Sequence, residues 1–242
     1  MLQIKTLDID YAEYHKKVTV YYNDSVELKA AILYFHGGGL LYGTREDLPE
    51  LHINTITNAG YAILSYDYPL APVSTLEVIH KDVCDSVHNY LTHAEYYVGS
   101  KLPYFLWGRS AGAYLCLLAA AKGDFFVNPH GIISYYGYGF LCDNWFKTPS
   151  AHYMTFPAVP SSCIREIKSE IETNGPMDTH FMRYVYARQT GNWKDLIFTD
   201  REKFLYLNYS LRLCDHLPCP LFCAHSTRDT DVPYEEFLEL QK

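Results

Sequence analysis

Short apolar runs of strand length alternate with segments of helical periodicity over the first half of the chain. The strand-like runs are Val18–Tyr22, Ala30–Phe35, Tyr61–Tyr66, Tyr104–Trp107 and Gly131–Tyr136. The helical segments between them span 47–59, a face formed by Leu76, Ile79, Val83 and Val87, and the apolar stretch 111–122. Strands separated by helices form parallel βαβ units, and a parallel sheet is covered on both faces. The pattern therefore predicts an α/β fold with a mainly parallel sheet flanked by helices.

Sequence signals at the helix ends support these boundaries. Asp47 and Glu50 have the spacing of a capping box, and Ser74 and Glu77 repeat it. Gly60 follows the first helix, where a glycine commonly ends a helix.

The alternation lapses between 141 and 213, where helical and loop patterns replace strands. Ile164, Ile167 and Ile171 have helical spacing, and aromatic residues are dense around Phe181–Tyr186 and Phe204–Tyr209. Strand character returns at Pro220–His225, and no linker or repeat marks a second unit. We expect a single domain, 1–242, in which 141–213 forms a helical cap. Trp145, Phe146 or Tyr184 are candidates to line an apolar pocket under it.

Composition narrows the classes of partner. The net charge is −8 with no basic run, which argues against nucleic acid as a ligand. No window reaches the roughly 18 apolar residues of a membrane span, and the first residues resemble no secretory signal. Seven scattered cysteines indicate reduced thiols and a cytoplasmic location, with neither a metal nor another cofactor expected. Aromatic residues make up 16% of the chain, which fits either an aromatic core or an aromatic-lined pocket.

A G-x-S-x-G motif, Gly108 to Gly112, stands between the run 104–107 and the apolar helix 111–122. A nucleophilic serine needs a sharp strand-to-helix turn that pushes its Oγ clear of the backbone. Glycines flank such a turn because side chains there would collide with the neighbouring strand and helix. The motif predicts Ser110 as a nucleophile.

A second glycine motif, His36-Gly37-Gly38-Gly39, follows the strand-like run 30–35. Consecutive glycines let the backbone approach a ligand and direct N–H groups at a developing oxyanion. No G-K-[ST] follows, so a nucleotide phosphate loop is not supported.

With both motifs in this order, the chain resembles the α/β-hydrolase fold and, within it, the hormone-sensitive-lipase-like carboxylesterases, over roughly 30–240. The resemblance implies a serine hydrolase with an oxyanion hole formed by the amides of Gly38, Gly39 and Ala111. The segment Tyr68–Pro72 is similar to the family's Y-R-L-A-P, with Pro69 in place of arginine. Arg109 replaces the more usual aspartate. We expect neither departure to touch the catalytic machinery.

The segment His225–Pro233 is similar to the family's H-G-x-x-D-x-x-V-P. By this match Asp229 is the catalytic acid, and Asp231 is expected to cap a helix that begins at Pro233. His225 matches a histidine that is not the base, so we expect it to bond the loop.

The catalytic histidine of this family follows the acid, and no histidine follows Asp229 here. The resemblance thus implies that the last strand, the histidine loop and the final helix are missing. Either the sequence is a fragment whose base lies beyond Lys242, or the protein has lost its base. In the second case these 242 residues would have little or no activity.

Three functions stay open. The first is a carboxylesterase or lipase acting on small apolar carboxylic esters. The second is a non-catalytic ligand-binding relative, as in the gibberellin receptors, and the third is a peptidase or acyltransferase on the same fold. The partner is a small-molecule ester in the first case, and self-association into a homo-oligomer is left open.

Overall fold

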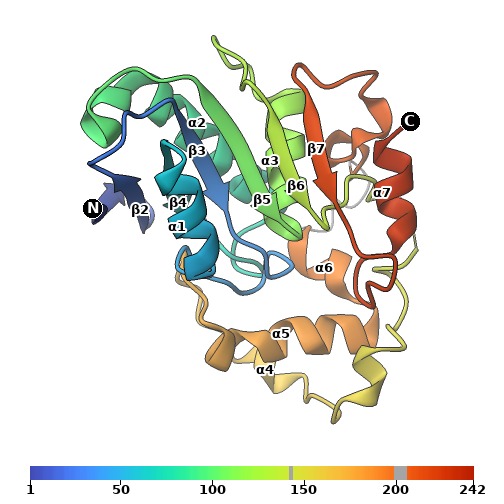
Figure 1. Ribbon diagram of the computed structural model, residues 1–242. Helices are drawn as coiled ribbons and strands as arrows, with labels where there is room; N and C mark the ends of the chain where they lie inside the picture. Colours follow the sequence, from blue (N-terminus) through green and yellow to red (C-terminus); the bar gives the residue numbers. More distant parts are fainter. Residues whose placement is uncertain (142–143, 199–205) are drawn as a thin grey trace.

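The computed structural model describes residues 1–141, 144–198 and 206–242, and Figure 1 shows their arrangement. The described residues form a seven-stranded sheet in the order β1-β2-β4-β3-β5-β6-β7. Pairing is parallel from β4 to β7, whereas β1 and β2 run antiparallel to their neighbours. The strands are β1 Leu2–Asp10, β2 His15–Asn23, β3 Ala30–Phe35, β4 Tyr61–Tyr66, β5 Tyr104–Arg109, β6 Ile132–Tyr135 and β7 Leu221–Ala224. The mainly parallel sheet predicted from the sequence is confirmed.

Helices cover both faces of this sheet, with α1 in front of it and α2 and α3 behind it in Figure 1. The α-helices are α1 Glu50–Asn58, α2 Leu76–Val98, α3 Ala111–Lys122, α4 Ser162–Arg165, α5 Met177–Thr190, α6 Trp193–Ile197 and α7 Tyr234–Leu240. Short 3₁₀ turns are η1 Tyr153–Thr155, η3 Tyr206–Tyr209 and η4 Leu211–Leu213.

Strand β3 shows how the sheet divides the core, because its side chains alternate between two clusters. Ala31, Leu33 and Phe35 belong to the cluster that contains α2 and α3. Ile32 and Tyr34 pack on the other face, with residues of α1. Burial on both faces explains why the strand reads as an unbroken apolar run.

Strand β1 escaped the sequence prediction because its alternation is poor. Ile4 is 60% exposed, whereas the neighbouring Gln3 and Lys5 are partly buried. A strand with polar residues on its inner face and an apolar residue outside lacks the period-two signal.

The predicted helix caps are off by one or more residues. Helix α1 begins after Pro49 with no side-chain cap, and Asp47 accepts a hydrogen bond from Tyr34 Oη instead. Helix α2 is capped by Thr75 rather than Ser74. Gly60 has a φ of 89°, as expected for the glycine that ends a helix.

The described part of 141–213 contains helices and turns, and the structure assigns no strand to it. A single bridge joins Gly175 to Gly43. Helix α4 is a single turn that includes Ile164 but neither Ile167 nor Ile171, so the longer helix suggested by the isoleucines is wrong. Phe204, in the second aromatic stretch, lies outside the described residues.

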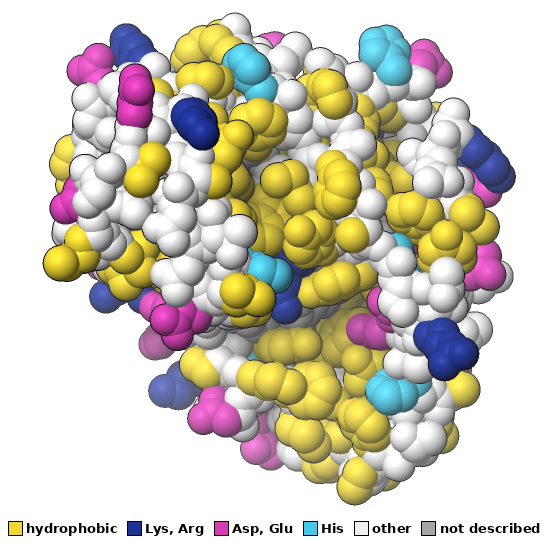
Figure 2. All heavy atoms as spheres, viewed as in Figure 1, with side chains coloured by type: hydrophobic (Ala, Val, Ile, Leu, Met, Phe, Trp, Pro, Cys, Tyr) yellow, Lys and Arg dark blue, Asp and Glu magenta, His cyan; other side chains and the backbone are white. Residues whose placement is uncertain are grey.

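Figure 2 shows hydrophobic side chains gathered on the front of the sheet and in the hollow above α4 and α5. Among the exposed apolar residues is Phe222 of β7, at 60% exposure. In the described residues, no helix has the length and apolar character that crossing a membrane requires.

Candidate active site

Ser110 occupies a strained turn between β5 and α3. Its φ of 51° and ψ of −119° lie in a region that residues other than glycine rarely adopt. Its N–H donates to Tyr135 O at 2.9 Å, which ties the turn to β6. A Cβ on Gly112 would overlap the carbonyl oxygen of Phe35, and one on Gly108 would overlap the backbone of Gly112. The steric reason for the two glycines, expected from the motif, is thus seen in the structure.

The glycine loop after β3 lies against this turn. Gly38 and Gly39 have φ values of 107° and 58°, which favour glycine. A Cβ built on Gly37 would lie 3.4 Å from Ser110 Cβ, so the two loops are in near contact. The two motifs, about 70 residues apart in the sequence, therefore meet at one end of the sheet.

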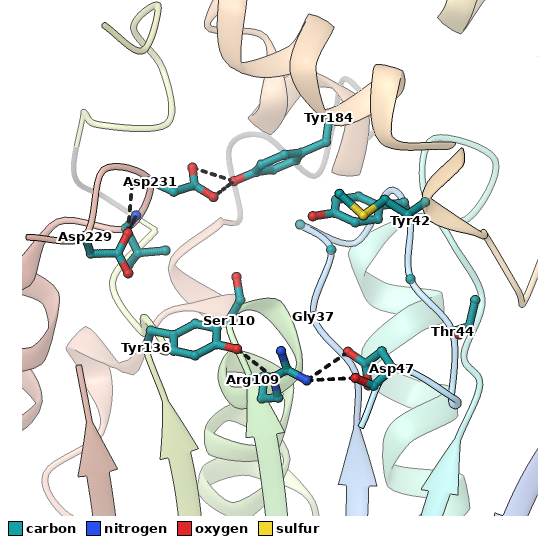
Figure 3. A pocket seen from close by; sticks show the side chains of 15 residues that line it. Gly37, Tyr42, Thr44, Asp47, Arg109, Ser110, Tyr136, Tyr184, Asp229 and Asp231 are labelled. Carbon is teal, nitrogen blue, oxygen red and sulfur yellow. Dashed lines mark hydrogen bonds and ion pairs between the residues drawn. The ribbon is translucent and has the colours of Figure 1, made fainter. Parts of the chain in front are cut away.

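A cavity of about 470 Å³ opens at this meeting point, and Figure 3 shows part of its lining. Ser110, Gly38, Gly39 and Asp229 all line it, whereas Ala111 is fully buried behind it as the first residue of α3. The other lining residues are Gly37, Tyr42, Gly43, Thr44, Asp47, Arg109, Tyr136, Met177, Tyr184, Asp231 and Val232.

The loop after β7 anchors Asp229 through the backbone. Its Oδ1 accepts hydrogen bonds from the N–H groups of Asp231 at 2.8 Å and Val232 at 3.0 Å. His225 is buried, and its Nε2 lies 3.0 Å from Val232 O and 3.6 Å from Asp229 Oδ2. Because a carbonyl can only accept, Nε2 donates, and His225 bonds the loop as the sequence predicts.

Asp231 does not cap the following helix, so that prediction is wrong. Helix α7 has Pro233 at its N-cap and no side-chain cap. The Asp231 carboxylate instead accepts from Tyr184 Oη, 2.9 Å from each oxygen, and lies 3.2 Å from Arg188 Nε. Burial raises the pKa of Asp231, and the Arg188 charge opposes that rise. These partners are more than 40 residues away, and no local pattern reports them.

The cap segment also holds the glycine loop. Trp193 Nε1 donates to Gly39 O at 2.7 Å, and the Tyr184 ring fills the space that a Cβ on Gly39 would need. Tyr184 lines the cavity, as expected from the sequence, but the expected pocket is not apolar, because charged residues also line it: Asp47, Arg109, Asp229 and Asp231. Trp145 and Phe146 do not line it and pack against Trp193 instead.

Arg109 lines the same cavity as Ser110, and its assigned contacts are with Tyr136 and Asp47. It stands at a variable position of the G-x-S-x-G motif, so the sequence carries no signal for this place in the cavity wall.

Among the residues that the structure describes, no histidine lines the cavity. His36, from the glycine motif, is buried and stacks on Tyr68 with ring centroids 4.1 Å apart. His180, in the cap, has Nε2 at 3.2 Å from Glu172 Oε2.

Solved structures share this architecture. A protein of unknown function from Staphylococcus aureus subsp. aureus Mu50 superposes with a TM-score of 0.81 at 28% identity, covering 98% of this chain and 84% of that one. An α/β hydrolase superfamily protein from Enterococcus faecalis gives 0.80 at 23% identity, with the same coverage of both chains. An esterase from Pyrobaculum calidifontis gives 0.65 at 17% identity, covering 98% and 69%.

Curated relatives match shorter stretches. Lipase 2 of Moraxella sp. (strain TA144) is 33% identical over 95 residues, which are 39% of this chain and 22% of the lipase. The non-reducing polyketide synthase adrD of Penicillium roqueforti is 28% identical over 172 residues, or 57% and 7% of the two chains. The chain thus spans less than a quarter of the length of these relatives.

A family model covers nearly the whole chain. The model described as BD-FAE matches residues 19–242, from β2 through the loop that carries Asp229 to α7. Together with the sheet order and the strained serine turn, this match establishes that the chain has an α/β-hydrolase fold and belongs to the BD-FAE family.

Proposed function

We propose that the protein is a serine hydrolase of the carboxylesterase type, acting on small apolar carboxylic esters. The observation that carries the proposal is one cavity shared by a strained serine, a glycine loop and a carboxylate anchored by two backbone amides. A strained backbone at a serine lowers the stability of the fold, and such strain is found mainly at functional sites.

In the proposed reaction, Ser110 Oγ attacks the ester carbonyl carbon and loses its proton to a general base. The N–H groups of Gly38, Gly39 and Ala111 stabilise the negative carbonyl oxygen. The C–O bond to the alcohol then breaks, and the base returns its proton to the leaving alkoxide. Water cleaves the acyl–serine bond in the same way, releasing the acid and restoring Ser110.

The base in this scheme is a histidine held by Asp229. The Asp229 carboxylate suits this role because its Oδ1 is fixed by two amides, and its side chain still reaches the cavity. Since no described histidine lines the cavity, we place this histidine beyond Lys242, as the family resemblance implies.

The names of relatives support ester chemistry. Esterases from Pyrobaculum calidifontis and Tuber melanosporum share the fold, and Lipase 2 of Moraxella shares part of the sequence. Ester hydrolysis is therefore the reaction we assign to this cavity.

The absence of a histidine from the described cavity lining favours a second candidate, a non-catalytic protein that binds a small molecule. The peptidase and acyltransferase alternatives gain no specific support from the described residues.

Added imidazole separates the two candidates, because a small base can replace a missing histidine side chain. Hydrolysis of p-nitrophenyl acetate by residues 1–242 is measured with and without imidazole, and the imidazole-only rate is subtracted. We expect slow hydrolysis without imidazole, since loss of a triad histidine costs on the order of 10⁶ in kcat. With imidazole we expect a clear gain that Ser110→Ala and Asp229→Asn both lose. Equal rates for all three proteins would favour the binding protein.

A further inference from the structure

The Arg109 guanidinium is held rigidly in the wall of the cavity. Its Nε donates to Tyr136 Oη at 2.6 Å, and its Nη1 donates to Asp47 O at 3.0 Å. The Asp47 carboxylate lies 3.6 Å from Nη1. With only 24% of its side chain exposed, Arg109 has little freedom to reorient.

Its two partners are themselves fixed. The Asp47 carboxylate accepts a hydrogen bond from Tyr34 Oη at 2.7 Å, from the core side. Tyr136 has a φ of 42°, and its N–H donates to Ala224 O at 2.6 Å. A tyrosine held in the left-handed region next to the proposed nucleophile is strain of the kind that collects at functional sites.

The second amino group of Arg109, Nη2, takes no part in this network. Among the described residues, no hydrogen bond is assigned to it, and Figure 3 shows the third guanidinium nitrogen directed into the cavity near Gly37. Fixing Asp47 and Tyr136 needs only the other two nitrogens. A donor that faces the cavity and takes no part in the network is suited to an acceptor on a bound ligand.

The position of Asp229 tells which part of an ester reaches Arg109. In the proposed reaction the base protonates the leaving alcohol, so the alcohol lies on the side of Asp229. Figure 3 shows Asp229 and Asp231 on one side of Ser110 and Arg109 with Asp47 on the other. With the carbonyl oxygen at the glycine amides and the alcohol toward Asp229, we place the acyl chain on the side of Arg109.

The charges that line the cavity indicate which chemical group on the acyl chain would bind Arg109. Asp47 offsets the Arg109 charge, and Asp229 and Asp231 add negative charge to the lining. A carboxylate on the substrate would be repelled by these groups, whereas a neutral oxygen only gains a charge-assisted hydrogen bond. We propose that Arg109 is a specificity residue that selects acyl chains carrying a neutral oxygen acceptor, such as an ether, hydroxyl or carbonyl. This inference rests on the proposed function for its assignment of the acyl side.

The test measures binding rather than turnover. Matched pairs of N-methyl amides, in which an ether oxygen of the acyl chain is replaced by a methylene group, are titrated by NMR at several chain lengths. All proteins carry Ser110→Ala, so neither hydrolysis nor acylation enters. At the best chain length we expect the ether to bind roughly tenfold more tightly, in line with one charge-assisted hydrogen bond.

Arg109→Met should bring this ratio close to one, and the exposed control Arg165→Met should leave it unchanged. Tyr136→Phe retains the guanidinium but removes the hydrogen-bond acceptor of its Nε, so it should lower the ether-to-methylene ratio less. If Arg109→Met fails to fold, the ratio measured in Tyr136→Phe tests the proposal instead. A ratio near one at every chain length in the protein that retains Arg109 would overturn the proposal. So would a tenfold preference for the ether that persists in a folded Arg109→Met variant. N-methylsuccinamate carries a carboxylate on its acyl chain. If it bound more tightly than the neutral ether and this binding depended on Arg109, the proposed preference for a neutral acceptor would be wrong. A confirmed ratio in a protein whose Ser110-dependent ester hydrolysis does not appear even with imidazole would instead contradict the proposed function.

Discussion

The turn at Ser110 and the loop at Asp229 supply two parts of one site, but they are held in different ways. Backbone crowding fixes the turn, since β3 and α3 leave room only for glycine at 108 and 112. The acid loop has its own hydrogen bonds, yet the Asp231 side chain depends on Tyr184 and Arg188 of α5. The turn at Ser110 is therefore fixed by the sheet and α3, whereas the loop at Asp229 is held both by its own hydrogen bonds and by α5.

This difference has a functional consequence. The Asp231 N–H orients Asp229, and the Asp231 carboxylate is bonded to the cap. Tyr184 also packs on Gly39. Movement of α5 would thus disturb the Asp229 loop and the glycine loop together and leave the turn at Ser110 intact.

The largest effect is expected in the serine turn. Gly112→Ala places a methyl group against the Phe35 carbonyl, and because backbone cannot yield as a side chain can, we expect destabilisation above about 3 kcal/mol or no folding. Gly99→Ala is the matched control: its φ is 80°, but no atom lies within 4 Å of the added Cβ. It should cost only about 1 kcal/mol. Urea denaturation compares them, and equal losses would show that crowding does not fix the turn.

A smaller loss of stability is expected at the contact between α5 and the loop that carries Asp229 and Asp231. Arg188→Met removes the cation beside Asp231 and should cost about 2–3 kcal/mol, less than a fully buried pair because Asp231 is 26% exposed. Adding Asp231→Asn to this variant should recover part of the loss, since no unpaired carboxylate is then left. If the double variant were as unstable as the sum of the two single variants, the pair would not be coupled.

Tyr184→Phe removes the hydroxyl that donates to Asp231 and keeps the ring that packs on Gly39. We expect a loss of about 1 kcal/mol in the free energy of unfolding. The control Tyr96→Phe, at a residue that is 66% exposed, should change it by less than about 0.5 kcal/mol. Hydrogen exchange should also quicken at the amides of Asp231 and Val232 in the first variant only. Unchanged exchange at these two amides would show that α5 does not stabilise the loop that carries Asp229.

The smallest effect concerns pH. Burial raises the pKa of Asp231 in the folded protein, so the folded state binds its proton more tightly than the unfolded state does. The contribution of Asp231 to stability is therefore greatest at low pH, below the unfolded-state pKa, and declines as pH rises through the raised pKa of the folded state. Asp231→Asn should lack this decline when unfolding is followed across that pH window. A steeper decline in the variant than in the wild type would contradict the sign.

The same contrast explains what the sequence could reveal. The glycines could be predicted from the sequence because a side chain is excluded locally: backbone crowding excludes it at Gly108 and Gly112, and a positive φ disfavours it at Gly38 and Gly39. The parallel strands could be predicted from apolar runs such as Ala30–Phe35, because such strands are buried on both faces. Each of these signals arises within a few residues.

Long-range contacts left no such signal. Asp231 follows the pattern of a helix cap, but its partners lie on α5. Arg109 stands at a variable position of the motif, and its place in the cavity wall depends on Asp47 and Tyr136 from two other loops. Strand β1 was missed because its inner face is polar at Gln3 and Lys5 and apolar only at Leu7 and Ile9, so apolar residues do not keep to one face.

Covalent labelling of Ser110 tests the central claim most directly. The protein is incubated with a fluorophosphonate in the presence of imidazole, and the adduct is located by peptide mass spectrometry. We expect a single adduct on Ser110 that is lost on unfolding and slowed at least about tenfold by Asp229→Asn. An adduct on another residue, or equal labelling of native and unfolded protein, would contradict a site built from Ser110 and Asp229.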